Sequence, residues 1–210
     1  MNISIQKGIV ADVDNLTAIQ KQAFERLYQI YQDEASPYLR GSNEIKYHIE
    51  NGTQDIYKIF ADELLCGGIA VRNNGNGDYT LNRIYILPQM QGKGIARKAI
   101  ELCEKHYPDA KKWTLGFPID QIANKKCYEY SGYYDTGLRD VLSDKLTLAV
   151  YEKAIIGIFE MRQTQLILAA EVIRASFVTV ATEFGLTEQN CTNHTSFITV
   201  EKLQNQFEQG

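Results

Sequence analysis

Apolar residues near the N-terminus follow two different spacings. Ile3 and Ile5 alternate with polar residues, which predicts a short strand. Beyond Asp12 and Asp14, either of which can cap a helix, apolar residues recur every three or four positions and predict an amphipathic helix. These helix positions are Leu16, Ile19, Ala23, Phe24 and Leu27. A second, shorter helix is expected near residues 43–50.

Three strand-like runs come next along the chain. The first run covers residues 55–61, and a turn connects it to the second run, residues 64–72. The third run covers residues 79–87. The segment between the last two runs holds two Asn-Gly pairs, which are typical of a tight hairpin turn. A glycine-rich loop then leads into a predicted helix that reaches about Tyr107.

The remaining part of this region predicts one more strand, one helix and a strand pair. The strand covers residues 112–117, and the helix covers about 122–131 with Gly132 closing it. A final antiparallel pair turns near residues 140–144. The order β-α-α-β-β-β-α-β-α-β-β over residues 1–154 predicts an α/β (α+β) domain with a mixed, mostly antiparallel central sheet flanked by helices.

Composition and charge limit the classes of partner. The formal net charge is -4, with 22 basic and 26 acidic residues, so we expect no nucleic acid as a partner. The longest apolar stretch near the end, Gln165–Ile173, is short and contains Glu171, so we expect no membrane span. The first residues lack a basic start followed by an apolar core, and the four cysteines form no close pair. These features predict a cytoplasmic protein with no membrane partner.

The glycine-rich loop has the composition of an anion site. Backbone N–H groups at a helix start have no partner within the helix, and the helix dipole adds positive charge there. Glycines at positions 92 and 94 let the chain curl so that successive N–H groups converge on one anion. Lys93 and Arg97 add charge at the rim. The implied ligand is a phosphate, with a diphosphate favoured.

Three motif families compete for this loop. A Walker loop needs a different glycine spacing and a hydroxyl after the lysine, and a dinucleotide fingerprint needs a third glycine where Arg97 stands. The pattern Gln91, Gly94, Ala96 resembles the pyrophosphate loop of the GNAT superfamily of acyl-CoA N-acyltransferases. A second register, through Gln89 and Gly92, also matches. The first register is preferred, because the strand before the loop then ends where the family's strand ends. The plainer alternative is a surface turn that is only rich in glycine.

A second segment, residues 123–133, carries the same resemblance. Tyr128, Gly132 and Tyr133 match the family's tyrosine, glycine and aromatic residue on a later helix. The order of elements also matches, so the resemblance covers residues 1–154 and implies the acyl-CoA N-acyltransferase fold. This sequence departs from the family pattern at one position. The family often has an asparagine that contacts CoA seven residues before the tyrosine. Gln121 stands there, while Asn124 lies four residues before, and either amide could serve.

The resemblance implies an N-acetyltransferase that moves an acetyl group from acetyl-CoA to a primary amine of a small molecule or peptide by direct attack on the thioester. The expected CoA contacts are Gln91, Gly92, Lys93, Gly94, Ile95, Ala96 and Arg97 at the pyrophosphate, Ile84, Tyr85 and Ile86 along the pantetheine arm, and Asn124. The pantetheine contact requires the sheet to open beside this strand. The N–H of Ile86 would then stabilise the developing oxyanion. The alternative is a non-catalytic acyl-CoA-binding module.

Tyr128 is the expected catalytic residue, a general acid for the leaving thiolate. A thiol pKa of about 8.5 lies below a tyrosine pKa of about 10, so the phenol can hold its proton until the thiolate needs it. The plainer role is core packing. No general base is assigned: Asp78 and Asp120 could act through water or be solvated loop residues. No metal is expected, because Cys191 and His194 have no matching second pair.

The acceptor would enter opposite CoA, between the first helices and the last strand pair. Asp33 and Glu34, in a tyrosine-rich connection, could attract a cationic amine or could be ordinary solvated loop residues. The sequence leaves the identity of the amine open.

Residues 155–210 exceed what one such domain needs and resemble the chain's own beginning. Apolar residues at positions 169, 172, 177, 180 and 184 repeat the spacing of Leu16, Ile19, Phe24, Leu27 and Tyr31. We therefore expect a helical appendage resembling the start of a second GNAT domain. Such a fragment cannot bury its apolar face alone. It is predicted to promote a homodimer, with Ile155–Phe159 adding to a sheet edge.

Overall fold

The computed structural model describes residues 1–155 and 163–209 of the 210-residue chain. The chain forms two compact units, Met1–Ile156 and Gly157–Gly210. The first unit contains a seven-stranded sheet and four α-helices, in the element order that the sequence predicts. The predicted α/β (α+β) fold class is confirmed.

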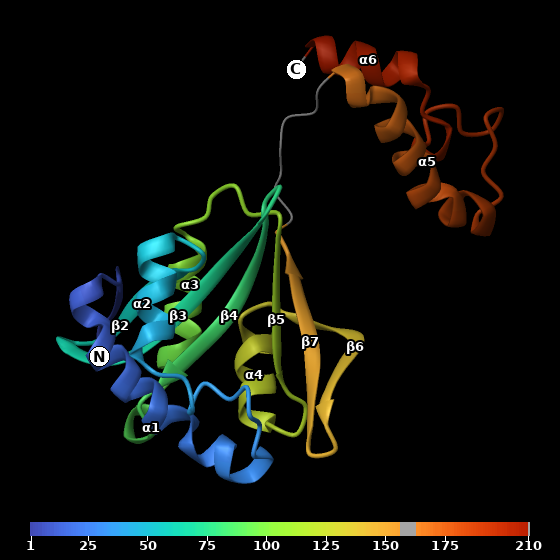
Figure 1. Ribbon diagram of the computed structural model, residues 1–210. Helices are drawn as coiled ribbons and strands as arrows, with labels where there is room; N and C mark the ends of the chain where they lie inside the picture. The colour runs from blue at the N-terminus through green and yellow to red at the C-terminus, as the bar shows by residue number, and fades with distance from the viewer. Residues whose placement is uncertain (156–162, 210) are drawn as a thin grey trace. The chain divides into compact units, whose positions relative to one another are not determined.

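The sheet has the strand order β1-β2-β3-β4-β5-β7-β6 (Figure 1). Every neighbouring pair is antiparallel except β4 and β5, which run parallel. The strands are β1 (Ile3–Lys7), β2 (Asp55–Ala61), β3 (Leu64–Gly75), β4 (Asp78–Ile86), β5 (Lys112–Pro118), β6 (Tyr134–Ser143) and β7 (Leu146–Ala154). The predicted hairpin turn lies at Asn76-Gly77, where both residues have positive φ.

Helices cover both faces of the sheet. They are α1 (Val13–Tyr31), α2 (Ser42–Asn51), α3 (Ile95–Glu104) and α4 (Ile122–Tyr130). Alternate strand residues point to opposite faces. Tyr85 of β4 accordingly belongs to the core under α1 and α2, with Leu16 and Ile45, while Ile86 belongs to the core with Ile95 of α3.

The parallel neighbours β4 and β5 separate soon after they start. They pair only at Asp78–Lys112, Tyr79–Trp113 and Thr80–Thr114, and both strands then continue unpaired with each other. Beside this point the β3–β4 register shifts, because Ala70 pairs with Arg83 while Val71 pairs with Leu81. Asn82 is the extra residue, and a bulge of this kind bends a strand. The opening in the sheet that the sequence analysis required is therefore present.

Two adjacent glycines in β3 allow β4 to lie close at the end where the sheet opens. A Cβ at position 67 would lie 2.2 Å from the carbonyl oxygen of Tyr85, and one at position 68 would lie 2.4 Å from the Tyr85 hydroxyl. Neither distance is compatible with a side chain. Gly67 and Gly68 therefore fix the position of the β4 end that carries Ile84 and Ile86.

The second unit is helical. It contains short 3-10 helices at Gln163–Gln165 (η3) and Thr195–Phe197 (η4), and the helices α5 (Leu166–Glu183) and α6 (Val200–Gln209). A small core joins Leu166, Ala170 and Leu203.

The second unit repeats one local arrangement of the first. In the first unit the 3-10 helix η1 (Val10–Asp12) precedes α1 directly, and η3 and α5 repeat this arrangement at an offset of 153 residues. The resemblance to the start of a second GNAT domain stays a prediction. So does the strand at Ile155–Phe159, because residues 156–159 lie outside the described part.

The helix α5 exposes many apolar side chains in its own unit. They are Ile167, Leu168, Val172, Phe177, Val178 and Val180, with Phe184 directly after the helix. The segment Gln163–Glu183 is long and apolar enough to cross a membrane. The shorter run Gln165–Ile173, on which the expectation of no membrane span rests, is only part of this segment. Length and composition do not distinguish a membrane segment from an apolar helix that packs against protein.

Replacing Gly67 by alanine should destabilise the sheet. The new Cβ would meet the backbone of β4 at 2.2 Å, and overpacking of this kind costs about 1–3 kcal/mol. The matched control is Gly116→Ala in β5, where a Cβ would meet only ordinary contacts at 3.6 Å and beyond. Chemical denaturation measures both free energies of unfolding. Equal stability of the two variants would contradict the close approach of β3 and β4.

The homodimer also stays a prediction. If the exposed surface of α5 forms it, the full chain should scatter light as a dimer. The double variant Leu168→Glu/Val172→Glu should then scatter as a monomer, while Ile122→Glu, on an exposed apolar residue of α4, should not change the mass. A monomeric unmodified chain would contradict the prediction.

Candidate functional site

The loop between β4 and α3 presents a row of free backbone donors. The N–H groups of residues 92–97 donate to no residue that the structure describes. The first intrahelical bond is donated by Lys98, 3.1 Å from the carbonyl oxygen of Gly94. Free N–H groups at a helix start, together with the helix dipole, are suited to binding an anion.

The two glycines give this loop its shape. Gly92 has a φ of 74° and Gly94, the N-cap of α3, a φ of 77°. An L side chain rarely adopts this left-handed conformation. Open space surrounds both positions, since an added Cβ would meet nothing within 4 Å. The glycines are therefore required by their backbone conformation, and they leave room for a ligand.

Gln91 ties the loop to the end of β4. Its side-chain amide donates to the carbonyl oxygen of Ile86 at 2.9 Å, while Gln89 is exposed and has no side-chain hydrogen bond to a described residue. This favours the register that the sequence analysis preferred. Lys93 and Arg97 are exposed, and both stay close in sequence to the free N–H groups, where their charges add to the field for an anion.

The edge of β4 offers alternate backbone groups to the opening in the sheet. Leu87 donates to the carbonyl oxygen of Cys66 in β3 at 2.8 Å, and hydrogen-bonded pairs alternate along an antiparallel ladder. Tyr85 therefore pairs with β3, while the N–H groups of Ile84 and Ile86 point toward the opening. Of the three predicted contacts on this strand, Tyr85 contributes packing and the other two contribute free donors.

Tyr128 lies on α4 at this opening. Its side chain is 9% exposed, packs against Phe117 of β5, and lines the cavity described below. The hydroxyl makes no hydrogen bond to any described residue. Burial, and then the neighbouring Cys127, raise the pKa of the Tyr128 phenol. The phenol therefore keeps its proton at neutral pH, as a general acid must.

The two candidate amides differ in their contacts. The Gln121 amide donates to the Tyr31 hydroxyl at 2.7 Å, and that hydroxyl donates to the carboxylate of Asp120. Burial, and then the bond to Asp120, raise the pKa of Tyr31 to about 12. Asn124 lines the cavity, and its side chain bonds to no described residue. Its amide is thus free for a ligand, whereas that of Gln121 holds α4 to the end of α1.

A cavity of about 240 Å³ occupies the opening between β4 and β5. It reaches from Tyr128 and Asn124 on the α4 side to residues of α1 and the α1–α2 connection. Most of its walls are apolar. The lining includes Phe24, Leu27, Tyr31, Ser36, Pro37, Leu81, Ile84, Phe117, Pro118, Leu142, Leu146 and Leu148. The charged residues in the lining are Asp33 and Arg83.

The other candidates from the sequence take different places. Asp33 reaches the cavity, where its carboxylate accepts the N–H of Ala35 at 3.0 Å, whereas Glu34 is exposed and does not line it. Asp78 pairs with Lys112, at 3.2 Å, where β4 and β5 still run together. Among the described residues, no three histidine, cysteine or acidic side chains gather as metal ligands.

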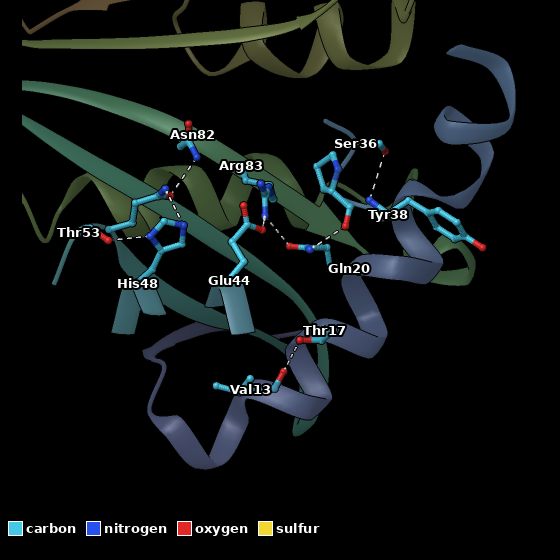
Figure 2. Close-up of polar contacts among 12 residues, drawn as sticks. Val13, Thr17, Gln20, Ser36, Tyr38, Glu44, His48, Thr53, Asn82 and Arg83 are labelled. Atoms are coloured by element: carbon cyan, nitrogen blue, oxygen red, sulfur yellow. Dashed lines mark hydrogen bonds and ion pairs between the residues drawn. The ribbon is translucent and has the colours of Figure 1, made fainter. Parts of the chain in front are cut away.

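His48 belongs to a hydrogen-bonded chain that ends at the bulge of β4. Its ring nitrogens contact Thr53 at 2.7 Å and Gln54 at 3.1 Å, and Asn82 donates to the same Gln54 side chain at 3.0 Å (Figure 2). Burial lowers the pKa of His48, so the ring is neutral at neutral pH. These contacts give His48 a structural role at the bulge.

Sequence reasoning missed a buried polar cluster beside the cavity. Gln20 of α1 is fully buried, and its side chain links the Pro37 carbonyl to the Arg83 guanidinium (Figure 2). Glu44 of α2 bonds the same guanidinium at 3.1 Å. A glutamine within the apolar stripe of the predicted helix was the available signal, since a buried amide requires partners.

Comparison with known proteins agrees with this geometry. The model of the acetyltransferase (GNAT) family matches residues 23–133, which include both the glycine-rich loop and Tyr128. No curated protein sequence matches the chain significantly.

Solved structures share the fold at low sequence identity. A PaiA N-acetyltransferase from Thermoplasma acidophilum in complex with coenzyme A is 18% identical, with a TM-score of 0.61 over 74% of this chain and 100% of that one. A ribosomal-protein-alanine N-acetyltransferase from Brucella melitensis is 19% identical (TM-score 0.60, 72% and 99%). A spermidine N-acetyltransferase chimera from Vibrio cholerae and hSSAT is 16% identical (TM-score 0.59, 73% and 96%).

Replacing Gly92 by alanine should weaken binding of CoA. A non-glycine residue in the left-handed region costs about 1–2 kcal/mol, so the turn would relax and its N–H groups would diverge. Titration calorimetry should show a Kd for CoA raised about tenfold or more. Gly52→Ala, with a similar φ of 60° at the end of α2, is the matched control and should bind CoA normally. Unchanged affinity in Gly92→Ala would contradict the anion site.

Proposed function

The chain belongs to the GNAT family of acetyltransferases, and on that premise we propose that it transfers an acetyl group from acetyl-CoA to a primary amine of a small molecule or peptide. One observation carries the proposal: free N–H groups of residues 92–97 and the open edge of β4 lie on the same strand–loop–helix segment, and Tyr128 lines the cavity in that opening. The names of the structural neighbours, which include acetyltransferases for spermidine and for a ribosomal protein, support an amine acceptor.

The anionic part of the donor fits the loop. A diphosphate needs several convergent donors and no side chain in the way, and Gly92 and Gly94 satisfy both conditions. Lys93 and Arg97 add positive charge at the rim. The amides of the pantetheine arm can pair with the N–H groups of Ile84 and Ile86 as an added strand would.

Ile86 and Tyr128 would assist the two halves of the reaction. When the amine nitrogen attacks the thioester carbon, negative charge develops on the carbonyl oxygen, and the N–H of Ile86 can stabilise it. The carbon–sulfur bond then breaks, the thiolate takes the proton of the Tyr128 hydroxyl, and the amide product forms. Solvent receives the proton that the amine loses and returns one to the phenolate.

The amine must be neutral when it attacks. An alkylamine has a pKa of about 10 in water, and burial between apolar walls favours its neutral form. The walls of the cavity, including Phe24, Leu27 and Leu146, provide this environment.

Tyr128→Phe should abolish most of the transfer and keep the donor bound. Losing a general acid lowers kcat by about 100-fold or more, and the Kd for CoA should stay within about twofold of the unmodified protein. Thiol release from acetyl-CoA, followed across a panel of amines, measures the first quantity, and calorimetry measures the second.

The matched control is Tyr130→Phe on the same helix, where the tyrosine is exposed. Its kcat should be unchanged. Full activity in Tyr128→Phe would exclude the acid role. Tight CoA binding without thiol release for any amine would instead favour the non-catalytic acyl-CoA-binding module.

A further inference from the structure

A buried amide in α1 has no explanation in packing alone. Gln20 is 0% exposed and lies on a mostly apolar helix face, with Leu16 and Ile19 beside it; the other buried polar residue there, Thr17, bonds within its own helix. Its Nε2 donates to the carbonyl oxygen of Pro37 at 2.9 Å, which leaves its Oε1 to accept from Arg83 at 2.9 Å. The contact with Pro37 therefore sets which end of the amide faces the arginine.

Arg83 is held by groups from two helices. One nitrogen, Nη1, contacts both the Gln20 oxygen and the Glu44 carboxylate, at 2.9 and 3.1 Å (Figure 2). The arginine side chain keeps only 15% of its surface exposed. Gln20 and Glu44 thus fix the guanidinium plane, as expected for a recognition group whose side-chain freedom has already been removed.

The rest of the guanidinium is not used by the protein. Nε and Nη2 of Arg83 bond to no described residue, and the side chain lines the cavity that Tyr128 also reaches. Neither nitrogen counts among the buried polar atoms without a partner, so both have access to open space. Two parallel N–H donors of this kind match the two oxygens of a carboxylate.

From this arrangement we infer that the acetyl acceptor is an amine that also carries a carboxylate, and that Arg83 binds this carboxylate. The inference rests on the proposed function and adds the class of acceptor. Asp33 is the other charged residue in the lining and can attract the ammonium group as the acceptor enters. The apolar walls suit an apolar side chain carried beside the two charged groups. An amino acid with an aliphatic or aromatic side chain combines these features.

Matched pairs of acceptors test the carboxylate directly. Leucine and isoamylamine differ only in that group, as do phenylalanine and phenethylamine. Thiol release from acetyl-CoA by the full chain should show a kcat/KM at least about tenfold higher for each amino acid, because a site with fixed polar donors discriminates against an analogue that leaves them unpaired. Arg83→Gln should remove this preference by raising KM for the amino acids, with little change for the two amines.

Three further variants separate recognition from folding. Glu44→Gln keeps the arginine charge and removes a competing carboxylate, so KM for the amino acids should stay the same or fall. Arg83→Gln/Glu44→Gln leaves no Glu44 carboxylate without its arginine partner, yet it should lose the preference as Arg83→Gln does. Arg72→Gln, on an exposed arginine of β3, should behave like the unmodified protein.

The outcomes distinguish the inference from the proposed function. Equal kcat/KM within each pair, or a preference for amino acids that survives in both Arg83 variants, would overturn the inference and leave the transferase intact. Equal loss of preference in Glu44→Gln and Arg83→Gln would also overturn it, because both would then act only by holding α2 to β4. The absence of thiol release with any amine would contradict the proposed function, and this inference with it.

Discussion

The separation of β4 and β5 is the constraint on which the rest of the site depends. The two parallel strands share only three paired positions, and beyond Thr80 and Thr114 each strand has an edge that the other does not satisfy. Unpaired backbone groups inside a domain need partners. In this protein the opening holds a cavity and directs the N–H groups of Ile84 and Ile86 toward it, so the defect in the sheet is the place where a ligand can pair.

Two features keep the sheet open. The bulge at Asn82 bends β4, and the glycines at positions 67 and 68 let the far part of β4 lie tightly on β3. From the end of that strand the chain passes directly into the free N–H groups that precede α3. A single continuous segment, from Leu81 to Arg97, therefore carries part of the cavity wall, the strand edge and the free N–H groups before α3.

The sequence predicted the fold well because its signals are local. The alternation in β1, the three-four spacing in α1, the Asn-Gly turn and the glycines before α3 each depend on a few neighbouring residues. The glycine-rich loop and Tyr128 are predicted from motifs of that kind. The cluster of Gln20, Glu44 and Arg83 could not, since its members lie on α1, α2 and β4 and meet only after the sheet forms. The hydrogen bond between Gln121 and Tyr31, which distinguishes the two candidate amides, likewise joins residues about ninety positions apart.

The most direct test of the account is the amide spectrum of the isotope-labelled protein during titration with CoA. We predict that the N–H resonances of residues 92–97, and those of Ile84 and Ile86, shift with saturation, while Tyr85 and the amides of α1 move little. Saturating binding that shifts a different surface, or no shift in the loop at a concentration where CoA binds, would contradict the central claim that this segment holds the acyl donor.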